Sequence, residues 1–433
     1  MPFQTASARK LRVLLSEGSS TSAREAITAL GLAGHEVEIA DPSPHCLGRF
    51  SRFVRRFHRC PPLSTDPEGY LRFILDVLVR RRFDVLVPIH EQGFLFARVR
   101  ERLEPHVAVA LPSFESYGQA LSKQRFAELL SELGLPQPRT TILKSLDQLR
   151  KAGDFPFLVK TELGTASRGV WLIQDRTKLL RTTEEIERDR AFGDGILAQE
   201  FVHGPVEHAQ AVYCRGRLVA MHSFRQLLQG AGGGDAVKES VSRPGVRQHL
   251  ALIGERLQWH GALSVDYILR DGEPLYIDCN PRLVEPMSAV LPGVDLMDVL
   301  LRVSRGEEAP EHPPGRAGVR THLAMQVLLG LALRGASRRE LIGEGWKLLT
   351  GTGRYAGSRE ELTPVGLDWA SLIPLLATVA ALLVHPPLAN SLAKRGWGDH
   401  LLTLDSMRKI EALETATSST ASRAKKGNRS PEL

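Results

Sequence analysis

The apolar and polar positions between Gly261 and Pro286 alternate in a way that predicts a β-hairpin. Apolar residues recur at every second position over residues 263–269, and a second such run covers residues 275–280. Asp-Gly with a nearby proline, between these runs, is a strong turn signal. Since successive side chains of a strand point to opposite faces, one face is a core face and the other gathers polar groups. The polar face is predicted to carry Ser264, Asp266, Ile268, Tyr276, Asp278 and Asn280.

The length of the turn decides which residues of the hairpin face each other. A two-residue turn at Asp271-Gly272 would place Asp266 opposite Ile277, on the wrong face. A loop of about three or five residues would place Asp266 opposite Asp278. Pro274 cannot donate a hydrogen bond to a strand partner, which favours the longer loop. We therefore expect the two carboxylates to stand opposite each other.

Carboxylate and amide oxygens on one face are typical ligands of Mg²⁺, which is usually shared with substrate phosphates. Asp266, Asp278 and Asn280 are therefore candidate metal ligands, and Arg282 follows directly. An ordinary hairpin with a solvated polar face is the alternative interpretation.

The N-terminal part has the pattern of a βαβ unit. A buried strand at 11–16 is followed by a serine-rich turn at 18–22, a helix to about Leu32 and a strand at 37–40. A dinucleotide site with Asp41 on a ribose would need a glycine pattern that is absent, so the turn is better explained as a helix N-cap.

A third strand, at 84–88, ends next to His90 and Glu91. Ligands of open parallel sheets bind outside the carboxyl ends of the strands, which makes this pair a substrate-site candidate. The alternative is that Glu91 caps the helix predicted at 92–103.

Five arginines alternate with three phenylalanines over residues 49–59. A polyanion-binding patch is one interpretation. The spacing of Phe50, Phe53 and Phe57 by three and four favours the other, an amphipathic segment with the rings inward and the arginines in solvent. We therefore expect no nucleic-acid partner.

Length and composition indicate the number of domains and the cellular compartment that we expect. The chain has 433 residues, 42% hydrophobic and 24% charged, which fits two to four globular domains. Its four cysteines show no metal spacing, and no signal peptide opens the chain, so a reduced cytoplasmic protein is expected. The net charge of +7 is compatible with anionic ligands without demonstrating them.

Two lysines and a small-residue loop precede the hairpin. Lys123 opens a predicted helix, and Lys160 ends an apolar strand at 155–159. The loop at 164–170 contains Ser167 and Gly169, and backbone N–H groups of such a loop can cradle phosphates. A further strand, LAQEFV, covers residues 197–202.

This ordered set resembles the ATP-grasp superfamily. IDCNPR followed by LVEP is similar to its metal-binding signature, although the family usually has Glu where Asp278 stands, and VDYI resembles the strand with the other metal ligand. The resemblance covers roughly residues 10–305 and is most specific at the hairpin. It implies an α/β fold: an open parallel N-terminal domain, a two-lobed α+β ATP-grasp module and a mainly helical C-terminal region.

The resemblance also implies ligands and roles. ATP and Mg²⁺, with Mn²⁺ as an alternative ion, are the implied cofactors. Lys123 and Lys160 would hold phosphates together with the loop of Ser167 and Gly169. Residues implied further along the chain are Glu200, Phe201 and Val202 at the adenine, Glu207 at the ribose, and Arg282, with Arg225 as a weaker candidate, at the acyl-phosphate.

The implied reaction activates a small-molecule carboxylate as an acyl-phosphate, joins it to an amine or thiol and releases ADP. The alternative is a catalytically weak nucleotide-binding sensor or scaffold, which the shorter Asp278 would permit. A dehydrogenase is a third, weaker hypothesis. Neither the substrates nor the oligomeric state follow from the sequence.

The expected domains are an N-terminal unit at 1–115, a small ATP-grasp lobe at 116–195, a large lobe at 196–306, a helical region at 307–413 and a disordered basic tail at 414–433. Residues 229–235 hold four glycines and predict a mobile lid or a disordered loop.

Residues 369–384 carry no charge and are interrupted by Pro374. This stretch is too short to span a bilayer comfortably. A buried helix packed on the ATP-grasp module or on residues 322–333 is the favoured interpretation. The alternative is a membrane-surface element flanked by Trp369 and Trp397, which would place the protein at the inner face of the membrane.

Overall fold

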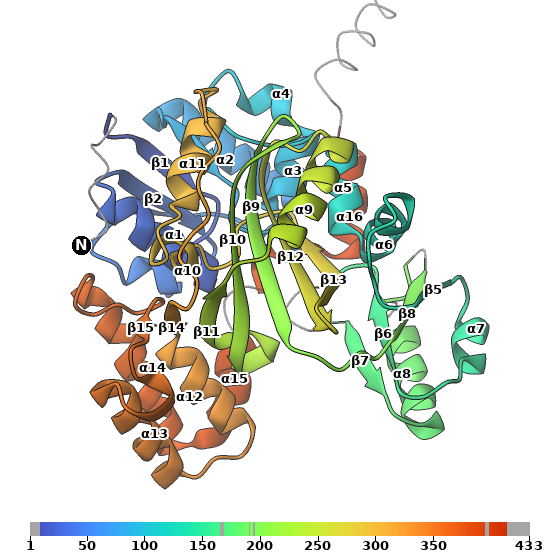
Figure 1. Ribbon diagram of the computed structural model, residues 1–433. Helices are drawn as coiled ribbons and strands as arrows, with labels where there is room; N and C mark the ends of the chain where they lie inside the picture. The colour runs from blue at the N-terminus through green and yellow to red at the C-terminus, as the bar shows by residue number, and fades with distance from the viewer. Residues whose placement is uncertain (1–8, 165–168, 190, 194, 395–397, 414–433) are drawn as a thin grey trace, which may run out of the picture.

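The computed structural model describes residues 9–164, 169–189, 191–193, 195–394 and 398–413. Three sheets organise these residues, and helices cover their faces (Figure 1). The implied α/β fold, with a parallel N-terminal sheet and a two-lobed module, is confirmed. The predicted loop residue Ser167 and the predicted tail at 414–433 lie outside the described residues.

The N-terminal sheet is parallel, with the strand order β3-β2-β1-β4. Its strands are β1 (Arg12–Leu15), β2 (Glu36–Asp41), β3 (Val54–Arg59) and β4 (Val85–Val87). Ser20 caps α1 (Thr21–Leu32) by accepting a hydrogen bond from the Ala23 N–H, and Asp66 caps α2 (Pro67–Arg81) in the same way from Gly69. The predicted helix starts are therefore confirmed, because each cap satisfies an N–H that the helix itself leaves free.

The arginine-rich segment is a strand rather than a run with helical spacing. After a 3₁₀ turn at Leu47–Arg49, β3 pairs in parallel with β2. Phe53 and Phe57 pack partly buried against the N-terminal core, as expected, while Arg55 and Arg56 are exposed. The predicted amphipathic packing is therefore found for Phe53 and Phe57, although the segment is a strand that contains only Phe57 of the three rings.

The small lobe is a four-stranded antiparallel sheet in the order β5-β8-β6-β7. Its strands are β5 (Thr140–Leu143), β6 (Phe157–Thr161), β7 (Val170–Ile173) and β8 (Ile196–Glu200). Helices α7 (Leu146–Lys151) and α8 (Arg176–Arg188) pack against each other, and α8 contacts β7, around buried Leu149, Leu179 and Ile186 (Figure 1).

The large sheet has seven strands in the order β13-β12-β9-β10-β11-β14-β15. The central strands are β9 (Val206–Cys214), β10 (Arg217–Gln229) and β11 (Asp235–Val241), and the metal hairpin is β12 (Gly261–Arg270) with β13 (Glu273–Asn280). The helix α9 (Pro244–Leu257) packs on β9 and β10, while α6 (Lys123–Glu132) contacts β13. The hairpin is thus an edge of the sheet that faces the small lobe (Figure 1).

The C-terminal region is joined to both other parts of the molecule. Strands β14 (Arg320–His322) and β15 (Arg359–Glu360) extend the large sheet, and α12 (Ala324–Leu333), α13 (Arg338–Thr350), α14 (Leu372–Val384) and α15 (Ala389–Lys394) form a helical group beside it (Figure 1). The last helix, α16 (Leu404–Glu411), leaves this group and packs on α2 and on α3 (Gln92–Arg98) of the N-terminal domain.

The uncharged stretch 369–384 forms a 3₁₀ turn at Trp369–Ser371 and then α14, and only one side of the helix is buried. Thr378 and Leu382 face α12, which matches the predicted packing partner. Ile373 and Leu376 are 49% and 55% exposed, so the prediction of a buried helix is wrong for the outer side. Among the described residues, no helix is long and apolar enough to cross a membrane.

Candidate active site

Asp266 and Asp278 face each other across the metal hairpin as predicted, but the turn is shorter than predicted. Asp266 pairs with Asp278, although the turn is the two-residue one at Asp271 and Gly272. Both turn residues have positive φ, at 53° and 88°, which suits a type I′ hairpin turn. The register shifts between Asp266 and Tyr267, where Ile277 is an additional residue of β13. This β-bulge restores the carboxylate pair that a regular hairpin would have split.

The bulge also corrects two assignments of side chains to faces. Tyr276 was expected on the polar face, but it pairs with Tyr267 in the core, with ring centroids 5.7 Å apart. Ile277, expected in the core, lines the cleft instead. An extra residue in one strand shifts its alternation by one position, and periodicity alone does not reveal it.

Lys123 and Lys160 reach the same cleft from the other lobe. Ser122 caps α6 and so directs Lys123, whose Nζ lies 2.9 Å from Asp278 Oδ1 and donates to the Gly164 carbonyl at 2.7 Å. Lys160, on β6, donates to the carbonyl of the bulge residue Ile277 at 2.9 Å. Burial lowers the pKa of Lys160 to about 8. The two predicted lysines are therefore brought together with Asp278.

The loop at 164–170, predicted to bind phosphates, is described by the structure at its two ends only. Gly164 accepts the hydrogen bond from Lys123, and Gly169 has a φ of 71°. A Cβ at Gly169 would lie 2.0 Å from the Thr161 hydroxyl, so glycine is required where the chain turns into β7.

His208 is a site residue that the sequence did not reveal. It lies on β9 opposite Asp266, and its Nδ1 is 2.8 Å from Asp266 Oδ1. Its Nε2 lies 3.4 Å from Asp235 of β11. Burial alone would lower the pKa of His208, but Asp235 and Asp266 outweigh burial and raise it well above its usual range. Only the pairing of β9 with β12 places this imidazole in the cleft.

Arg282 lies where the metal hairpin meets the N-terminal domain. It is 8% exposed, and its guanidinium contacts Asn280 Oδ1 and the Ser22 hydroxyl, each at 3.4 Å. Its main chain is fixed as well, because Ser264 donates to the Arg282 carbonyl at 2.7 Å. Burial lowers the pKa of Arg282, while Glu91 is the main group that opposes this effect. The predicted position of this cation next to Asn280 is therefore realised.

Glu207 and Arg225 do not line the cleft, contrary to their predicted roles. Glu207 is fully buried and ion-paired with Arg225 at 3.0 Å and with Arg243 at 2.6 Å, and it also accepts from the Tyr267 hydroxyl. It alternates along β9 with His208, which does line the cleft. The adjacent position on a strand points to the opposite face, so the ribose and acyl-phosphate assignments fail together.

The predicted adenine segment follows the end of β8 and does not line the described cleft. Glu200 is ion-paired with Arg270 at 3.1 Å, and Phe201 makes an edge-on contact with His203. Leu158, Val170 and Val206 are the apolar residues that line the cleft near Lys160. The roles of Glu200, Phe201 and Val202 stay predictions.

The glycine-rich loop has a defined conformation, which argues against the disordered alternative and leaves the lid as a prediction. Residues Ala231–Gly233 form a 3₁₀ turn between β10 and β11, closed by a hydrogen bond from Gly230 N–H to the Gly234 carbonyl at 2.7 Å. The Ala231 N–H donates to Gln326 of α12 at 3.0 Å. The C-terminal helices therefore hold this turn at the edge of the cleft.

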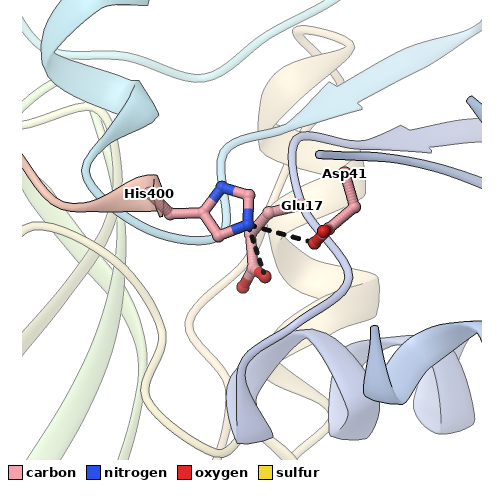
Figure 2. Close-up of side chains that lie close together, drawn as sticks. All are labelled: Glu17, Asp41 and His400. Carbon is pink, nitrogen blue, oxygen red and sulfur yellow. Dashed lines mark hydrogen bonds and ion pairs between the residues drawn. The ribbon is translucent and has the colours of Figure 1, made fainter. Parts of the chain in front are cut away.

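At the carboxyl ends of β1 and β2, His400 points between Glu17 and Asp41 (Figure 2). All three side chains are fully buried, and His400 Nε2 lies 3.0 Å from Asp41 Oδ2 and 3.8 Å from Glu17 Oε2. The other imidazole nitrogen contacts the Gln92 amide at 2.9 Å. Burial opposes the charge, but Asp41 and Glu17 raise the pKa of His400 above its usual range. Asp41 is thus a partner of a distant histidine and not a ribose ligand.

Glu91 belongs to the same junction. It does not cap α3 with its side chain; its carboxylate accepts a hydrogen bond from the Leu402 N–H. Burial raises the pKa of Glu91 to about 7. His90, its neighbour, lines the cleft. We name the described residues 398–413, which these contacts hold against the N-terminal domain, the C-terminal strap.

A second buried cluster joins three parts of the chain. Lys238 of β11 is ion-paired with Glu285 at 2.6 Å and with Glu361 at 2.7 Å, and Glu25 of α1 lies beside them. Burial and the neighbouring carboxylates raise the pKa of Glu25, and burial raises that of Glu361 to about 7. One cation shared among three carboxylates favours a bound proton in this cluster.

These groups surround one cavity of about 910 Å³. It is lined by both lysines, both aspartates, Asn280, Arg282 and His208, and it extends to the serine-rich turn and to the C-terminal helices. Two cations from one lobe thus face oxygen ligands from the other across this cavity. Such an arrangement can hold a polyphosphate with a divalent cation next to a substrate.

Comparison with known proteins confirms the resemblance. Residues 120–286 match the family model of the ATP-grasp domain. The large chain of carbamoyl phosphate synthase from Archaeoglobus fulgidus is 26% identical over 215 residues, which are 46% of this chain and 20% of that protein. The match therefore spans about a fifth of the length of that relative.

Solved structures show the same fold beyond the matched segment. A carboxyaminoimidazole ribonucleotide synthase from Aspergillus clavatus, complexed with ATP, has a TM-score of 0.60 at 13% identity, over 86% of this chain and 98% of that one. The biotin carboxylase domain of a 2-oxoglutarate carboxylase from Hydrogenobacter thermophilus has a TM-score of 0.58 at 17% identity, over 72% and 74%. At these identities the likeness is one of fold.

Proposed function

We propose that this protein is an ATP-dependent, ADP-forming ligase that activates a small-molecule carboxylate as an acyl-phosphate and joins it to an amine. The observation that carries the proposal is the single cleft in which Asp266, Asp278 and Asn280 face Lys123 and Lys160. The ATP-grasp domain at residues 120–286 supports it, as do relatives named for carbamoyl phosphate synthesis and carboxyaminoimidazole ribonucleotide synthesis.

The oxygen ligands fit a magnesium ion. Two carboxylates and one amide oxygen, all on one face, are the donor set that Mg²⁺ takes together with phosphate oxygens. Asp266, Asp278 and Asn280 would hold the ion, and when bound it would neutralise charge on the transferred phosphoryl group.

Side chains of the protein bind the phosphates and stabilise the acyl-phosphate. Lys123 and Lys160 bind the phosphates and orient the terminal phosphorus toward Arg282. Attack by a substrate carboxylate oxygen forms the acyl–O–P bond as the bond to the ADP oxygen breaks. Arg282 stabilises charge on the acyl-phosphate. An amine nitrogen then attacks the acyl carbon, and phosphate leaves with the electron pair of the broken C–O bond. The clamped turn at 230–234 helps to exclude water from this intermediate.

The test is release of ADP by purified protein supplied with ATP, Mg²⁺ and a broad mixture of carboxylates and amines, with products identified by mass spectrometry. We expect ADP release that requires both substrate classes and a new product whose mass equals acid plus amine minus water. Binding of ATP without substrate-dependent ADP release from any mixture or cell extract would refute the ligase.

That negative result would favour the second candidate, a nucleotide-binding sensor or scaffold. The ion pair of Lys123 with Asp278 supports it, because a phosphate and a metal would each have to compete for one member of this pair. Tight nucleotide binding coupled to a change in compactness, measured by small-angle scattering, would then be the expected behaviour.

We place the reaction in the cytoplasm, since all four cysteines are free, and include contact with an anionic membrane surface. The contact would be made through the predicted stretch 369–384, in which Trp369, Leu376 and Val384 are 65%, 55% and 73% exposed. Arg338 of α13 donates to the Val384 carbonyl at 2.7 Å, which places a cation at the end of this surface, as at a lipid interface.

Cosedimentation with phosphatidylglycerol vesicles at low salt tests the membrane contact, with Trp369→Ala as the variant. The wild-type protein should sediment and the variant should sediment less. Equal sedimentation of both, or none with anionic vesicles, would exclude this surface.

A further inference from the structure

The cavity extends beyond the part in which phosphates and a metal ion are proposed to bind. Lys123, Lys160, Asp266 and Asp278 occupy one end of its lining, and Arg282 marks the point where the metal hairpin meets the N-terminal domain. Beyond Arg282 the lining comes from segments outside the matched domain at 120–286, together with the turn at 231–234, which contacts α12. We name this second part the acceptor arm.

One wall of the acceptor arm is apolar and comes from the C-terminal helices. Met325 and Leu329 lie one helical turn apart on α12, and Pro374 and Thr378 lie one turn apart on α14. None of the lining residues between 324 and 393 carries a charge. Six of these eight residues are apolar and form what we name the apolar wall, while Gln326 and Thr378 are polar but uncharged. The apolar six are Met325, Leu329, Leu362, Pro374, Leu392 and Ala393.

The wall is fixed to both other parts of the molecule. A Cβ at Gly330 of α12 would meet the backbone of Gly230 at 2.9 Å, so glycine permits the helix to touch the turn beside the cleft. Asp368, just before α14, is ion-paired with Arg24 of α1 at 2.8 Å, and both side chains are fully buried. These contacts fix the position of the apolar wall relative to the turn beside the cleft and to the N-terminal domain.

The other wall carries the serine-rich turn together with Leu47 and Phe50 of the N-terminal domain. The Ser22 hydroxyl lies 3.4 Å from the Arg282 guanidinium, and the apolar residues Leu47 and Phe50 line the cavity as well. The N-terminal domain thus supplies a hydroxyl beside Arg282 and apolar side chains elsewhere in the lining.

We propose that the acceptor arm binds the apolar body of the carboxylate substrate, an aliphatic or aromatic chain without a second charged group. This inference rests on the proposed function and narrows its substrate class. A carboxylate head would lie near Arg282 while its chain displaces water from the wall of α12 and α14. A second charge on the chain would find no countercharge among these residues, and its burial would be unfavourable.

Binding to the full chain with Mg²⁺ and ADP tests the inference by calorimetry. The probes are decanoate, acetate and decanedioate, which is as long as decanoate but carries a second carboxylate. We expect decanoate to bind at least about tenfold more tightly than either of the others, since each buried methylene adds to affinity. Decanoate binding no tighter than acetate or decanedioate would overturn the inference.

Two variants locate the binding. Thr378→Arg introduces charge and bulk into the arm, and Met325→Lys does so at a half-buried position that accommodates a long side chain. Each should weaken decanoate binding about tenfold or more and leave ADP affinity unchanged. The matched control is Leu376→Arg, on the outer side of the same helix at 55% exposure, which should change neither affinity. Unchanged decanoate binding in both arm variants would overturn the inference.

The readout separates the two proposals. Selective decanoate binding that the arm variants abolish supports the arm even if no mixture releases ADP, in which case the ligase alone fails. ADP release that is supported only by short or doubly charged acids, with no decanoate binding, overturns the arm and leaves the ligase intact.

Discussion

At the end of the cleft where we propose that the reaction takes place, Asp266 and Asp278 face each other on one hairpin, twelve residues apart in the chain. At the N-terminal end, Asp41 meets His400, 359 residues further along. Both places bring acidic groups next to a cation: Lys123 at Asp278, and His400 at Asp41. Asp278 keeps 23% of its side chain exposed, whereas Asp41 and His400 have none.

The difference in exposure distinguishes a site that can bind ligands from an ion pair that stabilises the fold. A partly exposed carboxylate can exchange a lysine for a metal ion and a phosphate, because the cleft admits them. A fully buried ion pair that also hydrogen-bonds to backbone N–H groups, as Asp41 does with Gly18 at 2.9 Å, has no room for such an exchange. We infer that substrates react at the hairpin end, whereas the contacts of His400 hold the C-terminal strap against the N-terminal domain.

Replacement of the hairpin carboxylate has the largest expected effect. Asp278→Asn should reduce ADP formation by about 100-fold or more at saturating Mg²⁺, because a cation site supplies several kcal/mol to phosphoryl transfer. A coupled assay of ADP release measures it. Asp271→Asn makes the same change at the turn of the same hairpin and should leave the rate near that of the wild type. Full activity of the Asp278 variant would remove the metal assignment.

The matching change at the other end should act on stability. His400→Gln leaves two buried carboxylates without their cation, and we expect the free energy of unfolding to fall by about 3 kcal/mol. Urea denaturation near pH 6 measures this loss. His106→Gln, at an exposed position, is the control and should be nearly neutral.

The effect of His400 has a defined pH dependence. The folded pKa of His400 lies above that of the unfolded chain, so its stabilisation is complete below about pH 6.5 and is lost as the pH rises through the folded value. The difference between the variant and the wild-type protein should therefore shrink in alkaline buffer. A difference that grows with pH would contradict a protonated His400.

A third change sharpens the assignment of the phosphate end. Lys160→Ala should weaken ATP binding roughly 10- to 100-fold, the range expected for loss of one charge-assisted hydrogen bond. Calorimetric titration with ATP and Mg²⁺ measures it. Lys178→Ala removes an exposed lysine from α8 of the same lobe and should have no effect. Equal affinities for the two variants would leave Lys160 without a role at the phosphates.

The last change concerns Glu91 and the C-terminal strap, where we expect an altered pH profile rather than a large loss at one pH. Because burial raises its folded pKa to about 7, Glu91 binds a proton between about pH 4.5 and 7 that the unfolded chain has released. Stability contributed by this group is therefore present at low pH and is lost as pH rises across this window, by roughly 3 kcal/mol at most. Glu91→Gln keeps the hydrogen-bond acceptor and should flatten this part of the pH profile. An unchanged profile would show that another group titrates there.

The sequence alone determined the phosphate and metal end of the cleft. Alternation along two neighbouring strands, together with a turn signal, predicted that Asp266, Asp278 and Asn280 share a face. The positions of Lys123 and Lys160 followed from a helix start and a strand end. These are local features, in which period and chain order fix relative placement over a few residues.

The tertiary structure decided the rest. A bulge at Ile277 set the register that the turn length alone would have misplaced, and the pairing of β9 with its neighbours turned His208 into the cleft and Glu207 away from it. His400 lies 120 residues beyond Asn280, the end of β13, and the residues of α12 and α14 that line the cavity begin 45 residues beyond it, at Met325. No spacing in the sequence encodes such contacts, because they depend on how whole elements pack and on which polar groups burial forces to pair.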